Sequence, residues 1–132
     1  MRKNNAFALP TPTEADEQTT LFEWAELQSG RYPELKLLYH VPNGGSRNKI
    51  EAARLQAQGV KAGVPDLCLP VARGGNHGLY IELKRQRGGR ISEEQVRWIE
   101  ELMKQGYSAA ICRGWQEAAR TIVEYLQQKT EE

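Results

Sequence analysis

Apolar positions recur at two spacings along the chain, and each spacing predicts one kind of element. Apolar residues three or four apart indicate helices, whereas short apolar runs or strict alternation indicate strands. Helices are predicted over 13–29, 48–58, 92–105 and 115–128. Strands are predicted over 37–41, 66–71, 79–84 and 107–113. This interleaved order predicts an α/β domain in which helices flank a central mixed β-sheet.

Caps and breakers sharpen some of these boundaries. Thr13 is an N-cap followed by three acids, and Gly30 ends the same helix. Pro70 lies inside a predicted strand, which predicts an edge position or a bulge because proline donates no backbone hydrogen bond. The side chains expected to point inward from the helix over 48–58 are Ile50, Ala53 and Leu55.

The length of 132 residues fits a single domain. Residues 1–12 are polar and aperiodic, so they are predicted to form a flexible tail before a domain over 13–132. Two cysteines exclude a disulfide scaffold. No apolar run is long enough for a membrane span or a signal peptide, so we expect a cytoplasmic protein without a membrane partner.

Basic residues are concentrated in the middle of the chain. The formal net charge is only +1, yet residues 47–90 contain nine lysines and arginines against three acids, a net charge of +6. The rest of the chain therefore carries −5. A polyanion-binding face would produce this distribution, although charge alone fits a solvated surface equally well.

Three ionisable residues are predicted to meet on one face of the sheet. Glu82 and Lys84 are two residues apart on a predicted strand, so their side chains point to the same side. A hairpin that turns at 74–78 brings Asp66 opposite the end of that strand. A hard divalent cation such as Mg²⁺ would relieve the repulsion between the two carboxylates and generate hydroxide from bound water. The alternative for Glu82 and Lys84 is a half-exposed strand without chemistry.

Four segments together resemble a known nuclease family. They are Gly63–Leu67 (GVPDL), Ile81–Lys84 (IELK), Arg90–Trp98 (RISEEQVRW) and Gly106–Cys112 (GYSAAIC). The first two resemble the motifs of the PD-(D/E)XK nuclease superfamily. With the other two, the chain resembles its virus-type replication-repair nuclease (VRR-NUC) family over about residues 14–126, in the stand-alone form that phages carry.

The resemblance implies a restriction-endonuclease-like fold and a Mg²⁺-dependent endonuclease that hydrolyses DNA phosphodiester bonds, with Mn²⁺ able to substitute. It further implies a homodimer acting on branched DNA such as a four-way (Holliday) junction, in the host cytoplasm if a phage encodes the chain. A two-fold dimer suits paired cuts across a symmetric junction. The alternatives are a flap or restriction-type nuclease of the same fold and a non-catalytic DNA-binding module.

The resemblance also implies roles for particular residues. Asp66 and Glu82 would bind the metal with the Leu83 backbone carbonyl, and Lys84 would be the catalytic lysine. Glu17 would add an acid from the first helix to the metal site. The alternatives are that Glu14 or Glu23 supplies this acid, or that Glu17 only interacts with the helix dipole at the N-terminus. Gln95 matches a helix glutamine that supports the site, but Ser92-Glu93-Glu94-Gln95 is also a capping box that competes for its side chain.

The remaining candidates concern DNA and the dimer. The basic loop after the catalytic strand would hold phosphates beside the cut, and other basic or turn residues extend that surface. The DNA-binding candidates are Arg85, Arg87, Arg90, Arg47, Lys49 and Asn43. Apolar side chains proposed for the dimer interface are Trp115 and Tyr125. His40 and His77 are interpreted as structural or incidental, and Cys68 and Cys112 as buried small hydrophobes.

Overall fold

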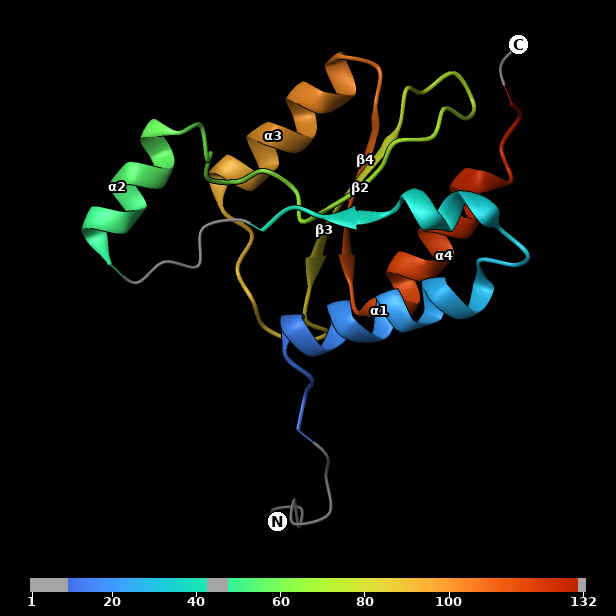
Figure 1. Cartoon of the computed structure of the whole chain (residues 1–132), viewed down its shortest axis with the longest axis horizontal. Coiled ribbons are helices and arrows are strands. Elements are labelled where there is room, and N and C mark those ends of the chain that lie inside the picture. Colours follow the sequence, from blue (N-terminus) through green and yellow to red (C-terminus); the bar gives the residue numbers. More distant parts are fainter. Residues whose placement is uncertain (1–9, 43–47, 131–132) are drawn as a thin grey trace, which may run out of the picture.

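The protein forms one mixed four-stranded sheet with helices on both faces (Figure 1). The computed structural model describes residues 10–42 and 48–130. The strand order is β1 (Tyr39–His40), β2 (Leu67–Leu69), β3 (Leu79–Lys84) and β4 (Ser108–Arg113). The β1–β2 and β2–β3 pairs are antiparallel, and the β3–β4 pair is parallel. The predicted α/β class with a mixed sheet is confirmed.

Helices divide between the two faces of the sheet. Helices α1 (Glu14–Gln28) and α4 (Trp115–Leu126) pack together on one face, while α3 (Glu93–Lys104) connects the parallel strands and packs against β4 (Figure 1). Alternation along β3 directs its odd-numbered residues toward α1 and α4. The core between sheet and helices includes Leu21, Leu67, Leu69, Leu79, Ile81, Leu83 and Ile122, each at most 1% exposed.

The predicted helix caps are present. Thr13 accepts a hydrogen bond from the Asp16 N–H and donates its own N–H to the Asp16 carboxylate, which completes a capping box at α1. Ser92 forms the same reciprocal pair with Gln95 at the start of α3. These local interactions fix where both helices begin, and the predicted starts are confirmed to within a residue.

The first predicted strand is mostly wrong. Residues Pro33–Leu37 form a 3₁₀ helix, η2, and only two residues of the predicted segment 37–41 pair as a strand. Pro33 has the fixed φ and missing N–H that suit a first helical turn, which explains the 3₁₀ start. Leu35 and Leu38 are buried, so the apolar run packs as a turn followed by a short strand.

The prediction for Pro70 is also wrong. Strand β2 lies between two other strands rather than at the edge of the sheet. Its pairing ends at Leu69, so exposed Pro70 follows the strand and never needs to donate within the ladder.

Helix α2 (Lys49–Ala57) projects from the rest of the molecule (Figure 1). None of its residues is buried, and Ile50 is 80% exposed. Ala53 is exposed as well, whereas Leu55 is half-buried. The prediction that Ile50 and Ala53 point inward is therefore wrong, because no sheet or helix face among the described residues covers them.

The burial of individual side chains tests the roles predicted for the two cysteines and for Tyr125. Cys68 and Cys112 are buried free thiols, as predicted. Tyr125 is 2% exposed, and its hydroxyl donates to the Val71 carbonyl, so it belongs to the core and the idea that it lines a dimer interface is wrong. Among the described helices, none combines the length and apolarity needed to cross a membrane. Residues 1–9, most of the predicted tail, lie outside the described residues.

Candidate active site

The β2–β3 register brings two carboxylates together. Leu67 pairs with Ile81, and continuing this antiparallel register places Asp66 opposite Glu82 on the same face of the sheet. The Leu83 N–H donates to Asp66 Oδ2 at 3.0 Å, which holds this carboxylate against β3. The Asp66 carbonyl accepts from the Val41 N–H at 2.7 Å, so β1 also fixes this residue.

Glu82 is a buried carboxyl group with an unusual proton affinity. It is 3% exposed. Burial and the neighbouring charge of Asp66 raise the pKa of Glu82 from 4.5 to about 8, although Lys84 opposes this shift. Without a further cation, the two carboxyl groups therefore resist being ionised together at neutral pH.

Lys84 supplies a buried ammonium group beside the pair. It is 5% exposed, and its Nζ lies 3.7 Å from Glu82 Oε2. The same Nζ lies 4.0 Å from Glu14 Oε2. Because Glu14 stands in the first turn of α1, that turn brings a third carboxylate to the end of β3.

Gln95 makes both of the contacts that the sequence set in competition. Its Oε1 accepts from the Ser92 N–H at 2.9 Å and completes the capping box. Its Nε2 donates to Glu82 Oε2 at 2.9 Å. The expectation that site contact requires abandoning the cap is wrong, since the two ends of one amide make the two interactions.

A glycine permits the close approach of the segment before Asp66 to α3. Gly63 has φ +91°, and a Cβ there would lie 2.7 Å from Glu94 Cβ. This contact packs the residues that lead into β2 against the first turn of α3. The same first turn carries Gln95, so the packing helps to bring Gln95 and Asp66 to the site together.

Replacing Gln95 with glutamate separates its two interactions. The introduced carboxylate can still cap the helix, but it sets a third acidic group against Glu82 where a donor stood. We expect the DNA cleavage that the family resemblance implies to fall by about tenfold or more, as for other residues that orient a ligand, with little change in thermal stability. The matched control is Ser92→Ala, which should cost about 1 kcal/mol of stability and leave cleavage intact. Unchanged cleavage by Gln95→Glu would leave Gln95 as a cap alone.

Glu17 has partners other than the carboxylate pair. It is 1% exposed, its Oε1 accepts from the Trp115 N–H at 2.9 Å, and its Oε2 accepts from Gln86 Nε2 at 2.9 Å. Both contacts lead to the start of α4 and to the turn after β3. Glu14, an alternative that the sequence left open, is the α1 acid that contacts Lys84.

The donor set can be compared with the needs of a divalent cation. Within the described ranges, no group of three or more histidine, cysteine or acidic side chains is arranged to hold a metal ion. The Asp66–Glu82 pair nevertheless has the chemistry that suits a hard cation, because two adjacent carboxylates are held together and one has a pKa raised to about 8. A bound cation would favour the ionised form of both.

The basic residues do not all gather at the site. Arg85 is half-buried directly after Lys84, while Arg87 and Arg90 are exposed on the same turn. Lys49 is exposed on the projecting helix α2. Asn43 and Arg47 lie outside the described residues.

Sequence reasoning missed Arg113 and Gln86. Arg113 is the parallel-strand partner of Lys84, and its Nη1 donates to the carbonyls of Arg85 and Gly88 at 3.3 and 2.6 Å. The signal that could have found it is its place at the end of the last predicted strand, because parallel strands align their carboxyl ends.

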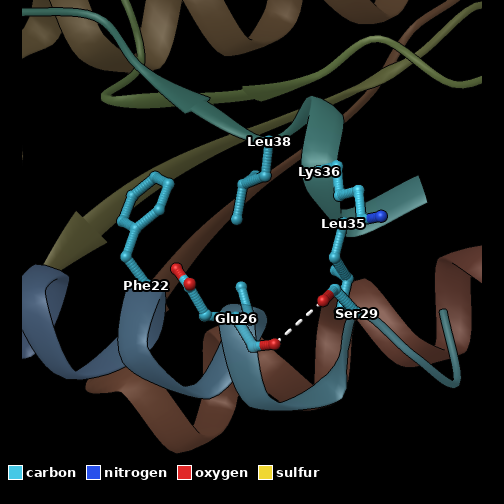
Figure 2. Close-up of a pocket in the computed structure, with 7 residues that line it drawn as sticks. Phe22, Glu26, Ser29, Leu35, Lys36 and Leu38 are labelled. Carbon is cyan, nitrogen blue, oxygen red and sulfur yellow. Dashed lines mark hydrogen bonds between the residues drawn. The ribbon is translucent and has the colours of Figure 1, made fainter. Parts of the chain in front are cut away.

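A separate hollow of about 340 Å³ lies between α1 and η2. Figure 2 shows Phe22 and Leu38 on its wall, and the Ser29 hydroxyl donates to the Glu26 carbonyl at 2.9 Å. None of the residues predicted for catalysis or DNA binding lines it. The candidate active site is therefore the cluster of Asp66, Glu82 and Lys84, and not this hollow.

Comparisons with known proteins agree with this geometry. The family model described as the VRR-NUC domain matches residues 12–116. A solved structure described as a VRR_NUC domain protein is similar with a TM-score of 0.81 and 34% sequence identity. That similarity covers 94% of this chain and 96% of the other chain. No curated protein matches the chain.

Proposed function

The chain belongs to the VRR-NUC family, whose domain is a nuclease of the PD-(D/E)XK type, and we propose that it is a metal-dependent DNA endonuclease. The observation that carries this proposal is buried Glu82, paired with half-buried Asp66 and lying beside buried Lys84. Two carboxylates that repel each other and adjoin a buried ammonium group have no evident structural benefit, whereas a divalent cation would stabilise the ionised pair.

The proposed ligands are Asp66, Glu82 and the Leu83 carbonyl, and Glu14 is the α1 acid that lies beside Lys84. When bound, Mg²⁺ or Mn²⁺ would polarise the scissile phosphate and supply hydroxide at neutral pH. Glu82 and Asp66 would keep the cation on one face of the sheet. Lys84 would neutralise the negative charge that grows on the phosphoryl oxygens, and Gln95 would hold the Glu82 carboxylate in orientation.

The proposed substrate is branched DNA, favouring a four-way junction, and the proposed active form is a homodimer that works in the cytoplasm. Support for a dimer comes from the projecting helix α2, whose Ile50 side chain is 80% exposed and suited to contact a second copy. Two sites related by a two-fold axis would make symmetric cuts.

A panel of DNA structures tests the function. Labelled four-way junction, flap, single-stranded and linear duplex DNA are incubated at equal concentration with Mg²⁺, with Mn²⁺ and with EDTA, and the protein's mass is measured by light scattering. We expect metal-dependent cuts, fastest on the junction, from a protein of twice the chain mass. A preference for flaps or duplex would correct the substrate, and binding without cuts under either metal would overturn the enzyme assignment.

Arginines on the turn after β3 should contribute affinity without sequence preference. We expect Arg87→Ala and Arg90→Ala each to weaken DNA binding similarly across sequences and to lower the slope of log affinity against log salt by about one. Titrations at several salt concentrations measure this slope. Arg120→Ala, which removes an exposed arginine from α4, is the charge-matched control and should leave the slope unchanged. If Arg87→Ala and Arg90→Ala keep the wild-type slope of log affinity against log salt, as Arg120→Ala is expected to, the turn does not contact DNA.

A further inference from the structure

The basic turn over residues 85–90 leaves β3 directly after Lys84 and is held in place by two residues that no role in catalysis requires. Gly88 and Gly89 both have positive φ, so the turn follows a path that suits glycine. All four remaining residues are polar or basic. A segment of this composition at the surface would ordinarily be mobile, so its anchors have to be explained.

The first anchor is Arg113, at the end of β4. Its guanidinium donates through Nη1 to the carbonyl oxygens of Arg85 and Gly88, at 3.3 and 2.6 Å. The backbone of the turn therefore packs against the Arg113 guanidinium, and Arg113 is the residue of β4 that pairs with Lys84. Hydrogen bonds from a charged donor are stronger than neutral ones, which makes this an effective clamp on the backbone.

The second anchor is Glu17, in α1. One of its oxygens accepts from Gln86 Nε2 and the other from the Trp115 N–H, both at 2.9 Å. Gly114 lets the turn approach α4 closely, because a Cβ there would lie 2.9 Å from Gln86 Cγ. Glu17 thus ties the turn to two helices while remaining buried.

Within this fixed turn, one buried side-chain donor has no acceptor among the described residues. Arg85 Nε is buried and lacks a hydrogen-bond partner among the described residues. A buried unsatisfied donor is costly, and a small movement of the half-buried Arg85 side chain would let Nε donate to a phosphate oxygen of DNA at the proposed phosphodiester site. The two anchors hold the turn in place before the ligand arrives, and the orphaned donor identifies Arg85 as the side chain that would receive it.

We propose that Glu17 and Arg113 are positioning residues that preorganise the turn over residues 85–90 as a cradle for a DNA phosphate, received by Arg85. This inference rests on the proposed nuclease function. In this proposal, Glu17 acts in substrate binding through Gln86 and is not one of the metal ligands.

Variants of Glu17 and Gln86 test the inference through a split between substrate affinity and maximal rate. Glu17→Gln should cleave within about threefold of the wild type, because the Gln86 amide can rotate and restore the pair. Gln86→Ala and Glu17→Ala should each raise the protein concentration that gives half-maximal single-turnover rate by about tenfold, with little change in the maximal rate. The Mg²⁺ dependence should not change. The double alanine variant should be no worse than the worse single one, since both remove one interaction.

Arg113→Lys tests the first anchor with the charge preserved. Both contacts come from the single nitrogen Nη1, and the shorter lysine side chain places its ammonium short of the two carbonyls, so we expect the same loss of affinity as in Gln86→Ala. Hydrogen exchange of the amides in residues 85–90, measured without DNA, should be faster in Gln86→Ala and Arg113→Lys than in the wild type. This measurement does not depend on nuclease activity, so it tests the anchors even if the wild type cuts no DNA.

Three results would overturn the inference. One is a loss of about 100-fold or more in Glu17→Gln with a shifted Mg²⁺ dependence, of the order expected for removing a metal ligand. The second is unchanged affinity in both Gln86→Ala and Arg113→Lys while the wild type cleaves DNA. The third is unchanged exchange in the turn of both variants. Gln86 is an exposed residue of the turn, so Gln86→Ala gives an answer even if Glu17→Ala fails to fold.

Discussion

Glu82→Gln is expected to lower the maximal rate of DNA cleavage by at least about 100-fold. The substitution keeps the size of the side chain and an acceptor for Gln95 Nε2, but it removes the charge that would hold a divalent cation. Asp66→Asn should have the same effect. Lys84→Ala should also lose most activity, because it removes the ammonium 3.7 Å from Glu82. Single-turnover assays on the preferred DNA at saturating Mg²⁺ measure each loss.

Two controls separate chemistry from folding and binding. Glu93→Gln removes an exposed acid from the first turn of α3 and should cleave like the wild type. DNA affinity of Glu82→Gln, measured without cleavage, should stay within about threefold of the wild type, since DNA affinity comes mainly from the basic surface. Substantial activity in Glu82→Gln would remove Glu82 from the metal site.

The same substitution is expected to stabilise the metal-free protein at high pH. The pKa of Glu82 is raised from its ordinary value of 4.5 to about 8 in the folded state, so the folded protein binds the proton more tightly than the unfolded chain. Stability of the wild type in EDTA should therefore fall as pH rises from about 5 to 8. Glu82→Gln lacks this titration and should be more stable by about 1–3 kcal/mol at pH 8, with a much smaller difference at pH 5.

Denaturant titrations of both proteins in EDTA at pH 5 and pH 8 measure the difference. Adding Mg²⁺ at pH 8 should raise the stability of the wild type more than that of Glu82→Gln, because a ligand stabilises the state that binds it. Equal stabilities at both pH values would show that burial and Asp66 do not perturb Glu82. If Glu82→Gln is instead less stable than the wild type at pH 8, Lys84 stabilises the ionised form of Glu82 by more than burial destabilises it.

Local patterns along the chain determined much of this protein. The alternation in β3 places Glu82 and Lys84 on one face because successive strand residues point to opposite sides, and this holds in any sheet. The caps at Thr13 and Ser92 fixed two helix starts, since a capping box involves residues only three apart. The approximate pairing of Asp66 with the end of β3 followed from a short hairpin, although the exact register did not.

Other features were decided only when distant segments met. Glu14 and Glu17 are three residues apart on α1 and share a helix side, so the sequence does not distinguish them. The position of α1 against the end of β3 places Glu14 beside Lys84 and Glu17 against the start of α4. Arg113 lies beside Lys84 because β3 and β4 pair in parallel, although helix α3 separates these two strands in the sequence.

Burial on the projecting helix depended on tertiary packing in the same way. The spacing of its apolar residues is compatible with an inward face, but Ile50 is exposed because no element in residues 10–42 or 48–130 covers it. Periodicity and capping are properties of a few adjacent residues, so the sequence expresses them directly. Which charged groups become neighbours depends on the docking of whole helices and strands, and that is determined by the balance of packing over the entire core.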